Sequence, residues 1–188
     1  MTKIFGVTGT FQAGKDSVAA LVGWKKFSCS DIIREECLRR GLSVDVNQNF
    51  VDVGNDLRKS SGDAGILGKK IVERILAGAV DRAIVVSIRT PAEFFALKNA
   101  KNVDFRLLVL DASIEVRFQR AKFLARYSGM SFGEFKAQED AQLKGTAEYS
   151  QQLGRVFELA DFKLINDFKS LDELKVAVFG VLKGWGWC

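Results

Sequence analysis

The sequence predicts an α/β fold in which helices cover both faces of a five-stranded parallel sheet. The first predicted strand, Ile4–Thr8, is apolar and runs directly into a glycine-rich turn and a helix. Two later apolar runs, Ala83–Val86 and Phe105–Leu110, are nearly continuous, as expected of strands that are buried on both faces. Segments with helical spacing separate the strands, and this alternation is typical of parallel sheets that bind ligands at their carboxyl ends.

The remaining elements are predicted from helix caps and from the spacing of apolar residues. In chain order they are a strand at Lys26–Cys29, a helix over 31–40 with Ser30 as its N-cap, helices over 50–57 and 66–75, a helix capped by Thr90, a helix over 113–126, a helix capped by Ser131, a strand at Phe162–Ile165 and a last helix capped by Ser170.

The turn after the first strand has the spacing of a phosphate-binding loop. Gly9, Gly14 and Lys15 match the pattern Gly-x-x-x-x-Gly-Lys, between a strand and a helix as that loop requires. The glycines let successive N–H groups point into one concavity, and the helix adds the positive end of its dipole. An ordinary turn with a surface lysine explains the pattern less well. We expect the nucleotide phosphates to be held by Gly9, Thr10, Phe11, Gln12, Ala13, Gly14, Lys15, Asp16 and Ser17.

The next position departs from the motif, because Asp16 stands where a serine or threonine hydroxyl normally coordinates Mg²⁺. A carboxylate beside bound phosphates repels them unless a cation lies between. Asp16 itself or Ser17, one position on, is therefore a candidate metal ligand, and the sequence leaves the choice open.

The composition narrows the classes of partner. The chain has 188 residues and a formal net charge of +5, which suits one domain. Lysines and arginines are scattered, so an anionic small molecule explains the charge better than nucleic acid. No apolar run approaches the roughly 20 residues that span a bilayer, so no membrane partner is expected. Three cysteines without metal-ligand spacing fit the reducing cytoplasm, and the lack of histidine excludes histidine catalysis.

Three segments in order resemble the nucleoside monophosphate kinase superfamily of P-loop proteins: Gly9–Ser17, Ser30–Arg34 and Ser87–Thr90. The pair Lys15-Asp16 is similar to the loops of phage deoxynucleoside monophosphate kinases and animal-type phosphomevalonate kinases. Nearly the whole length resembles archaeal predicted nucleotide kinases related to dephospho-CoA kinase. That likeness includes Ser30–Glu36, Gly54–Arg58, Ile88–Glu93 and Ala160–Asp167.

The resemblance implies a three-layer P-loop kinase fold in a single domain that uses ATP and Mg²⁺. It implies an acceptor-binding helical insert at about residues 31–80 and a small helical lid at about 121–150. It also implies roles for single residues: Arg34, Arg58 and Arg89 would hold the acceptor phosphate, Asp31 would lie near the acceptor, Arg120 and Arg126 would close over the transferring group, and Asn166 would lie near the donor base. Lys15, Arg120, Arg126 and Asp31 are thus the candidate catalytic residues.

One position departs from the superfamily. An acidic residue is expected at the end of the third strand, and this chain has Val85, Val86 and then Ser87 there. Asp31 and Asp111 remain as carboxylates for metal binding through water or for orienting the acceptor.

We therefore expect phosphoryl transfer from ATP to a small phosphorylated acceptor, a nucleoside or deoxynucleoside monophosphate. Two alternatives stay open. The first is dephospho-CoA kinase, whose acceptor is a ribose hydroxyl, and the second is a non-catalytic nucleotide-binding regulatory protein.

Overall fold

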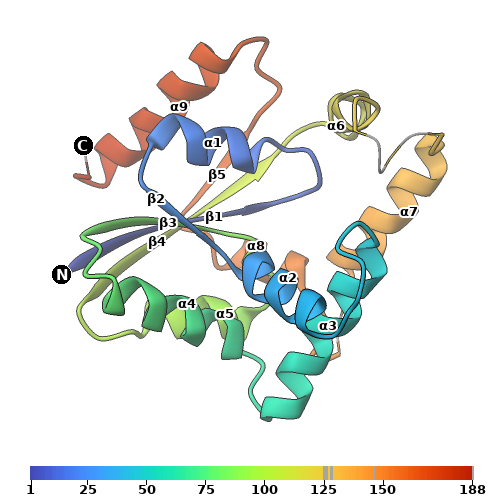
Figure 1. Cartoon of the computed structure of the whole chain (residues 1–188). Helices are drawn as coiled ribbons and strands as arrows, with labels where there is room; N and C mark the ends of the chain where they lie inside the picture. The colour runs from blue at the N-terminus through green and yellow to red at the C-terminus, as the bar shows by residue number, and fades with distance from the viewer. Residues whose placement is uncertain (125–126, 128, 146, 188) are drawn as a thin grey trace.

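The computed structural model describes residues 1–124, 127, 129–145 and 147–187. Its strands form one parallel sheet in the order β2-β3-β1-β4-β5 (Figure 1), which confirms the predicted fold class. The strands are β1 (Thr2–Gly9), β2 (Lys25–Ser28), β3 (Arg82–Val86), β4 (Val103–Asp111) and β5 (Phe162–Ile165). The helices are α1 (Lys15–Val22), α2 (Cys29–Arg39), α3 (Asn47–Ser61), α4 (Ile66–Ala77), α5 (Pro91–Lys98), α6 (Ile114–Ala121), α7 (Phe132–Leu143), α8 (Leu153–Glu158) and α9 (Leu171–Gly184).

Alternate residues of the central strands divide the core into two halves, as the period of two requires. On one face, Phe5 and Val7 of β1 pack in a cluster with residues of α1 and α9. On the other face, Ile4 packs in a cluster with residues of α2, α4, α5 and α8. In Figure 1 the first pair of helices lies above the sheet and the other four lie below it. Both faces of the sheet are therefore covered.

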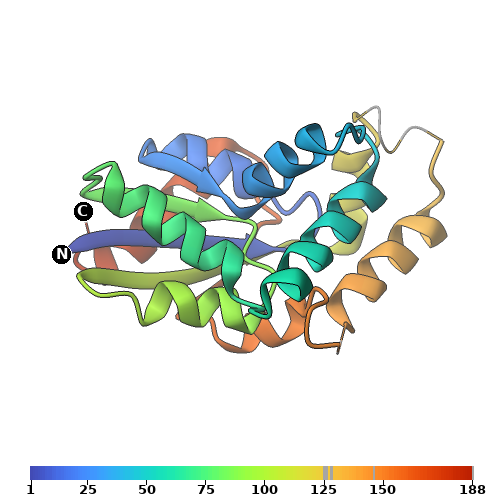
Figure 2. The same cartoon turned by 60° about the horizontal axis from the view of Figure 1, so that its bottom comes forward.

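Two helical regions stand beyond the carboxyl ends of the strands. Helix α3 lies between α2 and α4 in sequence, and helices α6 and α7 follow β4. Figures 1 and 2 both place α3 and α7 on the side of the molecule away from the start of β1. A small separate cluster of Ala121, Tyr127 and Phe135 joins α6 to α7. These regions flank the end of the sheet at which ligands are expected.

Several predicted boundaries are wrong, for identifiable reasons. Helix α2 starts at Cys29, because the hydroxyl of Ser28, not that of Ser30, accepts the capping hydrogen bond, which comes from the Ser30 N–H at 3.1 Å. Helix α6 ends at Ala121, whereas helical spacing had suggested continuation to Arg126. The short helix α8 was not predicted, because its six residues are fewer than two turns. The capping boxes at Thr90 and Ser131 are confirmed.

The carboxyl-terminal tryptophans pack beneath the amino ends of the strands. Trp187 is 2% exposed, its ring centroid lies 5.9 Å from that of Trp24, and its indole N–H donates to Asp104 at 3.1 Å. Trp185 packs edge-on against Phe5 with ring centroids 5.8 Å apart. Trp185 and Trp187 are thus packed against the core.

Replacing Trp187 with alanine is expected to lower the free energy of unfolding by about 3–5 kcal/mol, because a large aromatic side chain leaves a cavity and the Asp104 carboxylate loses a donor. Urea unfolding followed by circular dichroism measures this change. Val176→Ala is the matched control on α9, since Val176 is 75% exposed, and it should change stability by less than about 0.5 kcal/mol. Equal effects of the two substitutions would show that the tail does not contribute to the core.

Candidate functional site

The loop between β1 and α1 forms a cradle at the end of the central strand. Gly9 lies so close to β4 that a Cβ at this position would overlap the Leu110 carbonyl oxygen. Gly14 is the N-cap of α1 and has φ 99°, a left-handed conformation that favours glycine. Gln12 also has a positive φ, of 55°. These conformations turn the loop back on itself, as the phosphate-binding motif requires.

The loop is held from outside by three side chains. The hydroxyl of Thr10, itself 2% exposed, donates to the Asp111 carboxylate at 2.6 Å. Asn166, after β5, donates from its side-chain amide to the Ala13 carbonyl at 2.7 Å. Arg120 donates to the carbonyl oxygens of Gln12 and Asn166 at 3.4 and 2.9 Å. The ends of β4 and β5 and helix α6 therefore fix the shape of the cradle.

Lys15 bends back over this loop. Its ammonium group donates to the Thr10 carbonyl at 2.5 Å and takes part in further interactions. A phosphate bound in the cradle would meet this charge together with the amides at the start of α1. The role of Lys15 as a phosphate-binding cation stays a prediction.

The candidate metal ligands, Asp16 and Ser17, come directly after Lys15 in the chain. The Asp16 side chain is 84% exposed and pairs with Lys26 of β2 at 2.6 Å, while Ser17 is half-buried, and all three line the same cavity. Among the described residues, no group of three or more cysteine, aspartate or glutamate side chains could enclose a metal ion. Mg²⁺ typically uses one or two protein oxygens together with water and substrate phosphates. A carboxylate and a hydroxyl beside a phosphate cradle fit such an ion.

The predicted acceptor side lies across from the cradle. Arg34 of α2 is exposed and its guanidinium lies 5.2 Å from the ring centroid of Phe50 on α3. Arg89, after β3, donates to the Gly9 carbonyl at 3.4 Å, and burial lowers the pKa of its guanidinium from the ordinary value. Asp31 is exposed on α2. Arg34 and Arg89 thus present positive charge from two different elements.

Arg58 is placed differently from the other two arginines. It is 1% exposed and its guanidinium donates to the Glu93 carboxylate at 2.7 and 3.1 Å. The other carboxylate oxygen of Glu93 accepts from the backbone N–H groups of Arg89 and Thr90 at 2.7 and 3.1 Å. A phosphate role for Arg58 stays a prediction. The observed contacts join α3 to α5 and hold the backbone of Arg89.

A cavity of about 950 Å³ connects the two sides. Most predicted site residues line it: Phe11, Gln12, Gly14, Lys15, Asp16, Ser17, Asp31, Arg34, Arg58, Arg89, Arg120 and Asn166. Gly9, Thr10 and Ala13 belong to the same segment but are not part of the cavity lining, and Arg126 lies outside the described residues. The described lining carries seven lysines and arginines (Lys15, Lys26, Arg34, Arg58, Arg89, Arg120, Lys169) against three acids (Asp16, Asp31, Asp45). The cavity is therefore suited to an anionic ligand.

The strand ends offer few carboxylates to this cavity. Beyond Val86 of β3 stands Ser87, with φ 65°. Asp111, at the end of β4, accepts from Thr10 and from the Ala112 N–H, and it is not part of the cavity lining. In the part of the chain that the structure describes, Asp16 is the lining carboxylate on the phosphate-binding loop.

A buried ion pair connects the cradle to α7. Arg117 of α6 donates to the Ala112 carbonyl at 2.7 Å and lies 3.6 Å from Asp111. Its guanidinium also makes two hydrogen bonds with Glu139 of α7, and both residues are 5% exposed. Arg117 is not among the site residues that the sequence predicts. The pairing depends on a contact between two helices, which sequence spacing does not reveal.

Other residues at the site were not predicted either. Lys26 and Phe50 line the cavity, as does Gln151. The side-chain oxygen of Gln151 is buried without a hydrogen-bond partner in the described structure. Glu93 was predicted only as a helix cap. The pair of adjacent lysines at the start of the second strand is the one signal in the sequence for Lys26.

The buried cysteines have no place in the chemistry of the site. Cys29 and Cys37 are buried. Burial and the nearby Glu93 carboxylate raise the pKa of the Cys29 thiol well above its usual range. The thiol is therefore neutral at physiological pH and is a poor nucleophile.

Arg58→Met is expected to lower the free energy of unfolding by about 3–5 kcal/mol, because Glu93 keeps a buried negative charge without its main partner. Urea unfolding measures the loss. Arg74→Met is the matched control, since the Arg74–Glu35 pair has side chains 42% and 57% exposed and such pairs contribute about 1 kcal/mol or less. A loss at Arg58 no larger than that at Arg74 would contradict a structural role for the buried pair.

The chain is similar in sequence to one group of proteins and similar in fold to another. No family model matches the chain. A UPF0200/UPF0201 protein of Archaeoglobus fulgidus is 30% identical over 169 residues, which are 87% of this chain and 50% of that protein. The chain thus spans about half the length of this relative. A UPF0200 protein of Methanosarcina mazei is 28% identical over 188 residues, 98% of this chain and 96% of the relative. The predicted likeness to dephospho-CoA-kinase-related proteins stays a prediction.

Solved structures share the architecture at low identity. The shikimate kinase of Bacteroides thetaiotaomicron superposes with a TM-score of 0.57 at 16% identity and covers 98% of both chains. TT1252 from Thermus thermophilus gives a TM-score of 0.54 at 23% identity and covers 97% of both chains. A gluconokinase from Sinorhizobium meliloti 1021 gives a TM-score of 0.54 at 12% identity, with 97% of this chain and 93% of the other covered. The chain is similar in sequence to UPF0200 proteins, and its fold is that of the P-loop kinases.

Proposed function

We propose that this protein transfers the γ-phosphoryl group of ATP to a small phosphorylated acceptor, a nucleoside or deoxynucleoside monophosphate. One observation carries the proposal: a single cavity joins the cradle beside Lys15 to the arginines Arg34 and Arg89. Phosphoryl transfer needs cations around two phosphate groups held in line, and little else from the protein. The cytoplasmic location predicted from the cysteines fits such a reaction. No helix among the described residues is long and apolar enough to cross a membrane.

On the donor side, the amides of the loop and of the first turn of α1 bind the outer phosphates of ATP. Lys15 exchanges its bond to the Thr10 carbonyl for phosphate oxygens. Arg120, which faces the same loop, stabilises the negative charge on the transferring group. Asp16 and Ser17 would hold Mg²⁺, which supplies neutralisation of phosphate charge when bound.

On the acceptor side, Arg34 and Arg89 hold the acceptor phosphate, and Phe50 packs beside it. An acceptor phosphate oxygen forms the new P–O bond while the bond from the γ-phosphorus to the bridging oxygen breaks, and ADP leaves with that electron pair. The attacking oxygen of a monophosphate carries no proton near pH 7, so no histidine base is required. Asp31, which lines the same cavity, orients the acceptor in this proposal.

The helical regions beyond the sheet are assigned complementary tasks. The insert predicted at about 31–80 corresponds to α2, α3 and α4, and it carries the acceptor side. The lid predicted at about 121–150 includes α7, and its closure excludes water during transfer. The lid role of Arg126 belongs to this proposal and concerns a residue outside the described ones.

A second candidate function is nucleotide binding without transfer. The observation that favours it is the end of β3, where Val86 and Ser87 take the place of the expected acid. A regulatory protein of this kind would bind ATP in the same cradle but give no phosphorylated product with any acceptor.

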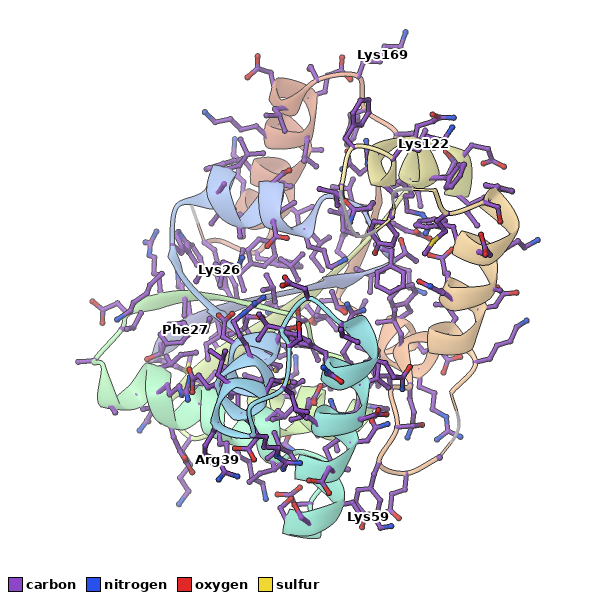
Figure 3. All side chains as sticks on the ribbon, turned by 45° about the vertical axis from the view of Figure 1, so that its right-hand side comes forward. Lys26, Phe27, Arg39, Lys59, Lys122 and Lys169 are labelled. Carbon is purple, nitrogen blue, oxygen red and sulfur yellow. The ribbon has the colours of Figure 1, made fainter. Side chains whose placement is uncertain are left out.

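Lys15→Met is expected to weaken ATP binding by at least about tenfold, because the loop loses a charge that faces the phosphates. The rise in thermal unfolding temperature on adding ATP, or calorimetric titration, measures this. Lys59→Met serves as the control: Lys59 is exposed on α3 and is well separated from Lys26 of the cavity in Figure 3. Undiminished ATP binding by the Lys15 variant would remove the basis for the kinase proposal.

A coupled assay with ATP, Mg²⁺ and each common nucleoside monophosphate is expected to detect turnover with at least one of them. Arg34→Met should then raise the acceptor KM about 10- to 100-fold with little change in the KM for ATP, because Arg34 contacts only the acceptor phosphate.

Arg39→Met is the control for this assay, since Arg39 pairs with Glu36 on the same helix and does not line the cavity. Turnover with dephospho-CoA that tolerates Arg34→Met would favour the ribose hydroxyl as acceptor. Tight ATP binding with no turnover would favour the regulatory alternative.

A further inference from the structure

The cavity contains a charge pair that the phosphate-binding motif does not include. The Lys26 ammonium lies 2.6 Å from the Oδ1 atom of Asp16, and both residues line the cavity. Asp16 holds the position normally taken by a metal-binding hydroxyl. Exposed ion pairs of this kind contribute little to stability. Any consequence of the pair therefore concerns what binds in the cavity.

The position of Lys26 follows from strand geometry. Successive side chains of β2 point to opposite faces of the sheet. Lys26 and Ser28 line the cavity, whereas Phe27 packs against the core on the other face. Lys25 does not line the cavity, and its ammonium lies 5.6 Å from the ring centroid of Phe27. Figure 3 shows Lys26 on the strand between helices α1 and α2.

The carboxylate of Asp16 creates a repulsion that the usual phosphate-binding motif does not have. The hydroxyl that usually stands at this position is neutral and does not repel a polyphosphate. The negatively charged Asp16 carboxylate does repel one. A metal ion cancels that repulsion when it binds. The Lys26 ammonium cancels part of it at all times, and the same positive charge opposes the approach of a dication to Asp16.

We propose that Lys26 is a built-in counter-ion of Asp16, and that it sets how strongly polyphosphate binding at the loop depends on Mg²⁺. This inference rests on the proposed function only in that the cradle accepts a polyphosphate. With Lys26 present, the cradle accepts the anion without metal, and Mg²⁺ adds a limited gain. Without Lys26, the bare carboxylate weakens metal-free binding and makes Mg²⁺ more necessary. Lys26 is thus a positioning and charge-compensating residue that acts through Asp16.

The test measures the dissociation constants of ADP and of inorganic tripolyphosphate by calorimetry, once with excess Mg²⁺ and once with EDTA. For each probe, the dissociation constant in EDTA divided by the dissociation constant in Mg²⁺ defines the metal dependence. This measurement requires no catalysis. In Lys26→Met the ratio should rise about tenfold over the unmodified chain, mainly through weaker binding in EDTA. Lys26→Arg, which keeps the charge, should restore the original ratio. Thermal unfolding without ligand should be unchanged in both variants.

Two controls isolate the pair. Lys25→Met removes an adjacent lysine outside the cavity and should leave the ratio unchanged. In an Asp16→Asn background, Lys26→Met should no longer alter the ratio, because no carboxylate remains to be compensated.

Each remaining outcome decides the matter. Binding with a ratio that Lys26→Met leaves unchanged overturns the inference and leaves the proposed function standing. A change that persists in Asp16→Asn also overturns it, since Lys26 would then act on the phosphates directly. If neither probe binds the unmodified chain in either condition, the inference and the proposed function fall together.

Discussion

The candidate site depends on the close approach of two backbones, at the end of β1 and along β4. Gly9 lies against the Leu110 carbonyl at a distance that admits no Cβ, so the loop begins on the sheet itself and not on a flexible connection. The parallel register of β1 with β4 brings Gly9 level with Leu110 and places Asp111 just beyond. Asp111 can then bind Thr10. A phosphate-binding loop needs such rigid support because its donors are backbone amides, which are positioned only by the path of the chain.

The two helical regions beyond the sheet are each anchored by a buried ion pair. Arg58 and Glu93 connect α3 to α5, and Arg117 and Glu139 connect α6 to α7. A buried pair adds little net stability compared with a well-packed apolar contact, but its geometry is demanding, because an unpaired buried charge is costly. Each pair therefore restricts how its region can sit relative to the strand ends. Glu93 also accepts a hydrogen bond from the backbone N–H of Arg89. The same carboxylate therefore anchors α3 and positions an arginine of the cavity.

The side chains that line the cavity carry more positive than negative charge. Arginines from separate elements surround a volume large enough for two phosphorylated groups, while the acids that line it are few. Asp16 is one of these acids. Its ion pair with Lys26 brings a positive charge from β2 to the loop. The cradle thus combines backbone N–H groups that the fold positions with side-chain charges from β2 and from the loop itself.

Local patterns in the sequence predict the fold class and the order of the strands and of most helices, and the structure agrees with both. Continuous apolar runs, capping boxes such as that of Thr90 and Glu93, and the spacing of Gly9, Gly14 and Lys15 are local signals. Each of these signals requires only near neighbours in the chain. The observed sheet confirms the predicted fold class, and the phosphate-binding role of the loop stays a prediction. Element ends were less determined, as the cap at Ser28 shows, because several nearby hydroxyls compete for the same role.

Which charged side chains share the cavity, and which are buried in pairs, depends on contacts between elements that are distant in sequence. Arg34 and Arg58 look equivalent in sequence, each on a predicted helix, yet one is exposed in the cavity and the other is bound to Glu93. Lys25 and Lys26 are adjacent, and strand pairing alone turns Lys26 toward Asp16. The physical reason is that an ionic partner is chosen by distance in space and by the cost of burying charge. Both are properties of the folded chain, and no local pattern of residues encodes them.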